Sequence, residues 1–136
     1  MTNSNHEILE KLSKAAFQAD RNEAHINLIA VSKQQPEERI ENSLASGQRI
    51  FGENRVQEAF QRWQPRKLVY PDLELHLIGP LQSNKASDAV ALFDVIHTVD
   101  RPKIALVLSR EMASARRSIP CFIQVNTGEE EQKAGI

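Results

Sequence analysis

The sequence is poor in the residues that form disulfides and metal sites. It has 136 residues and a single cysteine, Cys121, so no disulfide can form within it, which fits a reducing compartment. The four histidines lack the spacing of zinc ligands. Neither a Walker phosphate loop nor the glycine fingerprint of dinucleotide folds is present. We therefore predict no metal site and a cytoplasmic protein.

The net charge is also close to zero, aromatic residues are few, and long apolar runs are lacking. Seventeen basic residues face eighteen acidic ones, giving a formal net charge of -1, and aromatic residues make up 5%. This balance gives no electrostatic reason to expect nucleic acid as a partner. No apolar run approaches the roughly 20 residues that span a bilayer. Residues 1–7 show no signal-peptide pattern. We predict neither a nucleic-acid nor a membrane partner.

The chain does contain a regular alternation of strand and helix patterns. Apolar runs typical of strands occupy residues 26–32, 49–51, 73–78, 94–99 and 119–126. Patterns with helical spacing lie at residues 4–19, 36–46, 53–63, 86–93 and 102–112. The segment 64–72, with two prolines, is expected to be a loop. Strands that begin roughly 20–25 residues apart, each followed by a helix, predict a parallel sheet with helical crossovers.

This alternation indicates one α/β domain over residues 1–136. A helix and its connection take up residues 1–25, and βα units fill residues 26–136. Right-handed crossovers place the helices on one face if the sheet curls into a barrel, or on both faces if it stays open. Composition does not choose between the two. A closed (β/α)8 barrel needs eight strands and about 250 residues, so the five predicted strands would form an incomplete barrel.

Lys33 stands at the end of the first predicted strand, Ile26-Asn27-Leu28-Ile29-Ala30-Val31-Ser32. That run lacks polar alternation, so we expect a strand buried on both faces. Pro36 then marks a helix start. Burial at such a strand end disfavours the ammonium and frees a nucleophilic amine for a Schiff base. The alternative is a lysine that extends from the strand end into water.

Two further polar segments follow later strands. They are the turn at residues 52–54 and the segment from His76 to Lys85. Ligand sites of α/β proteins lie at the carboxyl ends of the strands. The three segments are therefore expected to converge on one rim, which favours a functional role for Lys33.

The same segments carry a family resemblance. Ala30-Val31-Ser32-Lys33, the FGENRVQE sequence at 51–58 and the HLIGPLQSNK sequence at 76–85 stand in order and at suitable separations. Gln124-Val125-Asn126 and the loop after it extend the match to the chain end. Together they resemble the pyridoxal phosphate homeostasis protein family. The resemblance implies an alanine-racemase-type TIM barrel, with pyridoxal 5′-phosphate held as a Schiff base on Lys33.

The resemblance also implies roles for two other residues. It places Asn54 beside the cofactor, where its amide can donate towards the phenolic oxygen of the ring; the alternative is that Asn54 caps a helix. His76 is a candidate ring contact, and the alternative is a satisfied core histidine. The phosphate contacts of the family lie on later strands that are absent from these 136 residues. We therefore expect the N-terminal portion of a longer barrel.

Three functions remain open at this point. The first is a protein of intracellular pyridoxal phosphate homeostasis that binds the cofactor without catalysing a reaction, with acceptor apo-enzymes as candidate partners. The second is a racemase-like enzyme, which needs a second base; the one tyrosine, Tyr70, precedes the third strand and lies at the wrong end of the sheet. The third is a truncated remnant that binds nothing. Oligomeric state and the regulated pathway are not readable from the sequence.

Overall fold

The computed structural model describes residues 4–136. Its helices are α1 Ser4–Gln18, α2 Glu37–Ala45, α3 Val56–Val69, α4 Ala86–Leu92 and α5 Pro102–Ala115, with short 3-10 turns at Glu23–His25 and Ser83–Lys85. Its strands are β1 Ala30–Val31, β2 Ile50–Glu53, β3 Glu74–Leu77, β4 Val95–Val99 and β5 Cys121–Ile123. The predicted alternation of strand and helix is confirmed.

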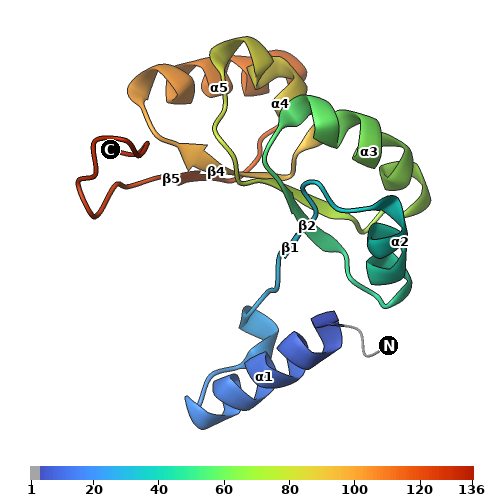
Figure 1. Ribbon diagram of the computed structural model, residues 1–136. Helices are drawn as coiled ribbons and strands as arrows, with labels where there is room; N and C mark the ends of the chain where they lie inside the picture. The colour runs from blue at the N-terminus through green and yellow to red at the C-terminus, as the bar shows by residue number, and fades with distance from the viewer. Residues whose placement is uncertain (1–3) are drawn as a thin grey trace.

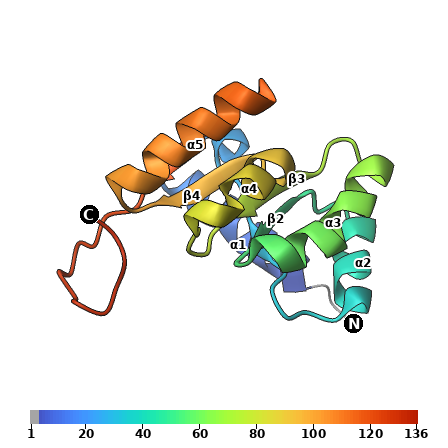
Figure 2. The ribbon, with the colours of Figure 1, turned by 90° about the horizontal axis from the view of Figure 1, so that it is seen from above.

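The five strands form one parallel sheet in the order β1-β2-β3-β4-β5. Each strand therefore pairs with the next one along the chain, and right-handed crossovers place the intervening helices on the same face. Figures 1 and 2 show α2 to α5 as one layer over the sheet, with α1 apart from them. This singly wound order is that of a (β/α) barrel, here with five strands, and it confirms the predicted incomplete barrel.

The hydrophobic core lies between the sheet and α2 to α5. Phe51 and Leu75 are register partners on β2 and β3, and both are fully buried against this layer. The ring of Phe51 lies 4.5 Å from that of Trp63 on α3. Because side chains alternate across a strand, the residues directly before and after Phe51 and Leu75 point to the other side of the sheet. We call that side the open face; its residues include Val31, Gly52, Glu74, His76 and His97.

Two local predictions are wrong. The first strand is not a run of seven residues buried on both faces: β1 has two residues, and Val31 is 48% exposed. Among residues 4–136, β1 is an edge strand that pairs only with β2. Val31 points to the open face, opposite the layer formed by α2 to α5 (Figure 1).

The second error concerns residues 64–72, most of which are helical and not a loop. Helix α3 continues through Pro65 to Val69. Proline removes one helical hydrogen bond, but Arg66 in the same turn pairs with Glu37 and Glu41 of α2 at 2.6 Å each. Lys67 donates to Leu92 O at 2.6 Å. These contacts hold the last turns of α3 against both neighbouring elements.

Helix α1 packs on the 3-10 turn Glu23–His25, where the hydroxyl of Ser13 donates to Glu23. Its Phe17 side chain is exposed. Within residues 4–136 no helix has the length and apolar character needed to cross a membrane.

A buried carboxylate ties the end of β1 to β2 and α3. Glu53 is 1% exposed, and its Oε1 accepts hydrogen bonds from Ser32 Oγ at 2.7 Å, Trp63 Nε1 at 2.9 Å and Arg62 Nη1 at 3.1 Å. Arg62 also donates to the carbonyl of Ser32 at 2.7 Å. The residue that precedes Lys33 is therefore fixed through both its side chain and its backbone.

Replacing Glu53 with alanine should destabilise the fold strongly, because three donors would lose their acceptor. We expect the free energy of unfolding to fall by roughly 3–5 kcal/mol. Glu58→Ala, which removes an exposed ion pair with Arg55, should change it by less than about 1 kcal/mol. Urea unfolding followed by Trp63 fluorescence measures both. Equal losses in the two variants would contradict the role given to Glu53.

Candidate functional site

Lys33 lies in a tight turn directly after β1. The amide of Gln35 donates to the carbonyl of Ser32 at 3.2 Å, and Gln34 has a left-handed backbone with φ 56°. Ser32 points towards the helix layer, where it meets Glu53. From the alternation of side chains along β1 we expect Lys33 to lie on the side of the open face. The predicted burial of the amine is not found, because Lys33 is exposed.

Asn54 follows β2 directly and is half-buried. The N-cap of α3 is Arg55, so the structure does not support a capping role for Asn54. Its backbone lies against Gly79 in the turn after β3: a Cβ on Gly79 would stand 2.1 Å from Asn54 O. Only glycine allows this approach, so the two turns lie in direct backbone contact. The side-chain amide of Asn54 has no hydrogen-bond partner within residues 4–136.

His76 lies on β3 and is 7% exposed. Its Nδ1 is 2.7 Å from Nε2 of His97, and its Nε2 is 2.7 Å from Oε1 of Glu74. Both ring nitrogens are therefore engaged within the protein. A ligand that reached His76 through a nitrogen would have to displace one of these partners.

His97, on β4, was not singled out from the sequence. Its ring lies 5.0 Å from those of His76 and Phe122. Burial and the neighbouring His76 lower the pKa of His97 below the usual 6.5. A histidine inside an apolar strand was the only available signal, since the contact with His76 depends on how β3 and β4 align.

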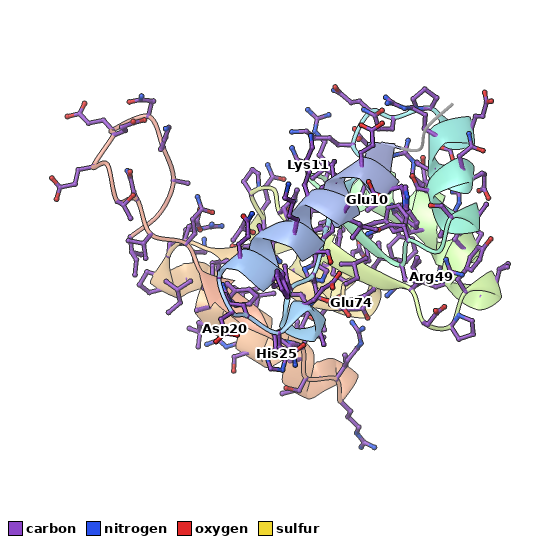
Figure 3. All side chains as sticks on the ribbon, turned by 90° about the horizontal axis from the view of Figure 1, so that it is seen from below. Glu10, Lys11, Asp20, His25, Arg49 and Glu74 are labelled. Atoms are coloured by element: carbon purple, nitrogen blue, oxygen red, sulfur yellow. The ribbon has the colours of Figure 1, made fainter. Side chains whose placement is uncertain are left out.

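Strand register brings the polar groups into rows across the open face. Val31 pairs with Gly52, and Gly52 pairs with His76. Leu77 pairs with Ile96. Continuing this register past the strand ends places Lys33, Asn54, Ile78 and His97 in the row at the carboxyl edge. His76 lies one row lower, level with Val31 and Gly52, and Glu74 lies lower still. Figure 3 shows Glu74 among the strands, seen past α1.

Arg101, which follows β4, contacts the segment that follows β3. Its guanidinium donates to Leu81 O at 2.8 Å and to Asp100 Oδ1 at 2.6 Å. This bond connects the turn after β4 to the segment after β3. Together with the Gly79 contact it fixes the loops at the carboxyl edge.

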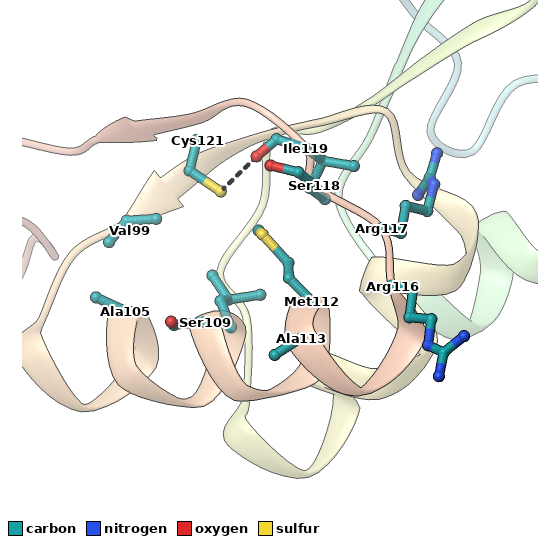
Figure 4. A pocket seen from close by; sticks show the side chains of 11 residues that line it. Val99, Ala105, Ser109, Met112, Ala113, Arg116, Arg117, Ser118, Ile119 and Cys121 are labelled. Atoms are coloured by element: carbon teal, nitrogen blue, oxygen red, sulfur yellow. Dashed lines mark hydrogen bonds between the residues drawn. The ribbon is translucent and has the colours of Figure 1, made fainter.

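A hollow of about 600 Å³ lies elsewhere, between α5 and β5. Figure 4 shows Val99, Met112 and Cys121 on its walls. It is on the helix side of the sheet, so it is separate from the row at the carboxyl edge. Burial raises the pKa of the Cys121 thiol, which disfavours a nucleophilic thiolate there. In the described part of the chain, no group of His, Cys, Asp or Glu side chains is arranged to hold a metal ion.

Curated proteins with known names match nearly the whole chain. The pyridoxal phosphate homeostasis protein of Escherichia coli is 39% identical over 131 residues, which cover 96% of this chain and 56% of that protein. That of Vibrio cholerae is 41% identical over 131 residues, covering 95% and 56%. The chain is a homologue of the pyridoxal phosphate homeostasis proteins. It spans about half the length of these relatives. No protein-family model matches it.

Solved structures agree with this homology. PipY of Synechococcus elongatus, solved with pyridoxal phosphate bound, is 40% identical with a TM-score of 0.76, over 92% of this chain and 57% of PipY. A protein of Bifidobacterium adolescentis is 28% identical with a TM-score of 0.85, over 96% of this chain and 56% of that protein. The fold is thus shared with slightly more than half of each longer chain.

The lowered pKa of His97 makes a prediction about stability and pH. The unfolded chain binds a proton at His97 more readily than the folded chain, so the contribution of His97 to stability is lost as pH falls below about 6.5. Urea unfolding of wild type at several pH values between about 7.5 and 5.5 should show this decrease. His97→Gln should lower stability at the upper end and flatten the pH dependence. His25→Gln, at an exposed position, should leave the profile unchanged, and a profile that His97→Gln also leaves unchanged would refute the prediction.

Proposed function

We propose that this chain binds pyridoxal 5′-phosphate and serves its homeostasis, with Lys33 as the Schiff-base residue. Homologues about 40% identical carry the name pyridoxal phosphate homeostasis protein, and PipY has been solved with the cofactor bound. Since the chain covers little more than half of these proteins, the role is a proposal for this chain.

The observation that carries the proposal is the row at the carboxyl edge of the open face. An exposed lysine, an unpaired amide and an imidazole stand there on neighbouring or nearby strands. Within residues 4–136, no hydrogen bond or ion pair engages the amine of Lys33. An accessible amine of this kind suits an aldehyde, and amide and imidazole groups suit the polar substituents of a pyridine ring. The donor set therefore fits the aldehyde end of the cofactor.

When bound, the cofactor supplies an aldehyde that reacts with an amine to give an imine, and its ring acts as an electron sink. The chain's own residues have simpler tasks. Lys33 contributes the amine, on a turn that Glu53 and Arg62 hold through Ser32. Asn54 offers its amide to the ring, and the backbone contact with Gly79 keeps it in position.

We further propose that binding is not followed by a reaction. The names of the relatives describe homeostasis and not catalysis. A racemase needs a second base near the carboxyl edge. Tyr70 follows α3 and precedes β3, and the guanidinium of Arg49 lies 4.6 Å from the centre of its ring. It therefore stands at the amino ends of the strands, away from Lys33.

Titration with pyridoxal phosphate tests the lysine assignment. Wild type should develop the absorbance of an imine, and Lys33→Ala should not. Borohydride reduction followed by peptide mapping should place the label on Lys33. Because the phosphate contacts implied by the resemblance belong to later strands, we expect the chain alone to require a large excess of cofactor. Lys103→Ala, at an exposed position on α5, is the matched control and should behave as wild type.

The outcomes of this experiment separate the three functions weighed above. Absence of imine absorbance in wild type would favour a remnant that binds nothing. A label on another lysine would reject the site while leaving cofactor binding in place.

Racemisation provides the remaining test. Incubation with pyridoxal phosphate and L-alanine, followed by chiral chromatography, should show no more D-alanine with wild type than with Lys33→Ala. Formation of D-alanine that depends on Lys33 would establish an enzyme and reject the proposal that binding is not followed by a reaction.

A further inference from the structure

A chain of three polar side chains crosses the open face, and only its last member, His97, entered the proposal above, as the imidazole of the carboxyl-edge row. It runs from Glu74 through His76 to His97, with two contacts of 2.7 Å. Its lower end, Glu74, is partly exposed, its centre is buried, and His97 is half-buried near the carboxyl edge. The chain of contacts therefore leads from the body of the sheet to the row that holds Lys33.

The hydrogen positions along this chain follow from the carboxylate. A carboxylate accepts hydrogen bonds, so Nε2 of His76 carries a hydrogen and donates it to Glu74. In a neutral imidazole the other nitrogen is then an acceptor. Nδ1 of His76 thus accepts from Nε2 of His97. By the same rule, Nδ1 of His97 is left with a lone pair and no hydrogen.

That Nδ1 atom is the free end of the chain nearest the carboxyl edge. It has no hydrogen-bond partner among the described residues and is not one of their buried atoms. His76, in contrast, has no free nitrogen.

The position of His97 suits a ligand held on Lys33. Both residues lie in the carboxyl-edge row, with Asn54 and Ile78 between them. Three strand spacings separate β1 from β4, about 14 Å along the sheet. An extended lysine side chain and an aromatic ring, met by the imidazole from the other side, together span this gap.

We propose that Nδ1 of His97 accepts a hydrogen bond from a hydroxyl or protonated ring nitrogen of the aromatic cofactor, and that Glu74 and His76 are positioning residues that set its tautomer. The proposal rests on the cofactor binding proposed above and deepens it. It moves the direct imidazole contact from His76, where the sequence suggested it, to His97.

The tautomers can be measured without any ligand. Long-range 1H–15N correlation spectra of the wild-type chain at neutral pH should show His76 and His97 both protonated at Nε2 and unprotonated at Nδ1. Glu74→Gln replaces the carboxylate by an amide that can also donate, and it should change the tautomer populations of both rings. A hydrogen on Nδ1 of His97 in wild type would overturn the proposal.

Binding supplies the second measurement. With pyridoxal phosphate as the probe, His97→Ala should weaken binding about fivefold to tenfold, the effect of losing one hydrogen bond. His25→Ala, at an exposed histidine on the 3-10 turn, should bind as wild type. In wild type, cofactor should shift the Nδ1 resonance of His97 and leave that of His25 in place. Thermal melting checks that each variant is folded.

The failures are distinguishable. If wild type forms an imine at Lys33 but His97→Ala binds equally well, the role of His97 is rejected and cofactor binding stands. If wild type shows no binding, both the proposed function and the contact from His97 are rejected. If His97→Ala does not fold, the wild-type Nδ1 resonance decides: a shift on adding cofactor supports the contact, and no shift rejects it.

Discussion

The carboxylate of Glu53 is the interaction on which the rest of the site depends. It is buried in β2 and receives hydrogen bonds from the end of β1 and from α3. A buried charge is tolerated only where donors compensate it. Ser32, Trp63 and Arg62 do so at Oε1, while Oε2 is buried without a hydrogen-bond partner among the described residues. Since Ser32 is the last residue before Lys33, the same carboxylate that joins sheet to helices also fixes the start of the lysine turn.

The two faces of the sheet carry different kinds of side chain. One face packs its large apolar residues against four helices, and the other carries the histidine pair, with Lys33 and Asn54 expected beside it at the carboxyl edge. In a barrel that second face is the interior, where ligands bind near the carboxyl ends of the strands. The turns at that edge are held by Gly79 and Arg101. Rigid turns of this kind limit the freedom that a ligand must remove on binding.

The sequence predicted all five strands because apolar runs and helical spacing are local signals. It missed the length of α3, since Pro65 argues for a break and the ion pairs of Arg66 with α2 cannot be read locally. It also predicted a buried first strand, because an apolar run does not show whether a strand has a neighbour on one side or two. Lys33 and Asn54 were proposed from their place after strands together with the family resemblance, and neither signal requires the register.

By itself, the sequence determined a parallel α/β chain and the residues that follow each strand, because both depend on patterns within a few turns of the backbone. Only the tertiary structure decided that His97 and not His76 stands in the same row as Lys33. Register between β3 and β4 is set by packing across the sheet, and a shift of one residue would send each side chain to the opposite face. The free nitrogen of His97 is a consequence of that packing.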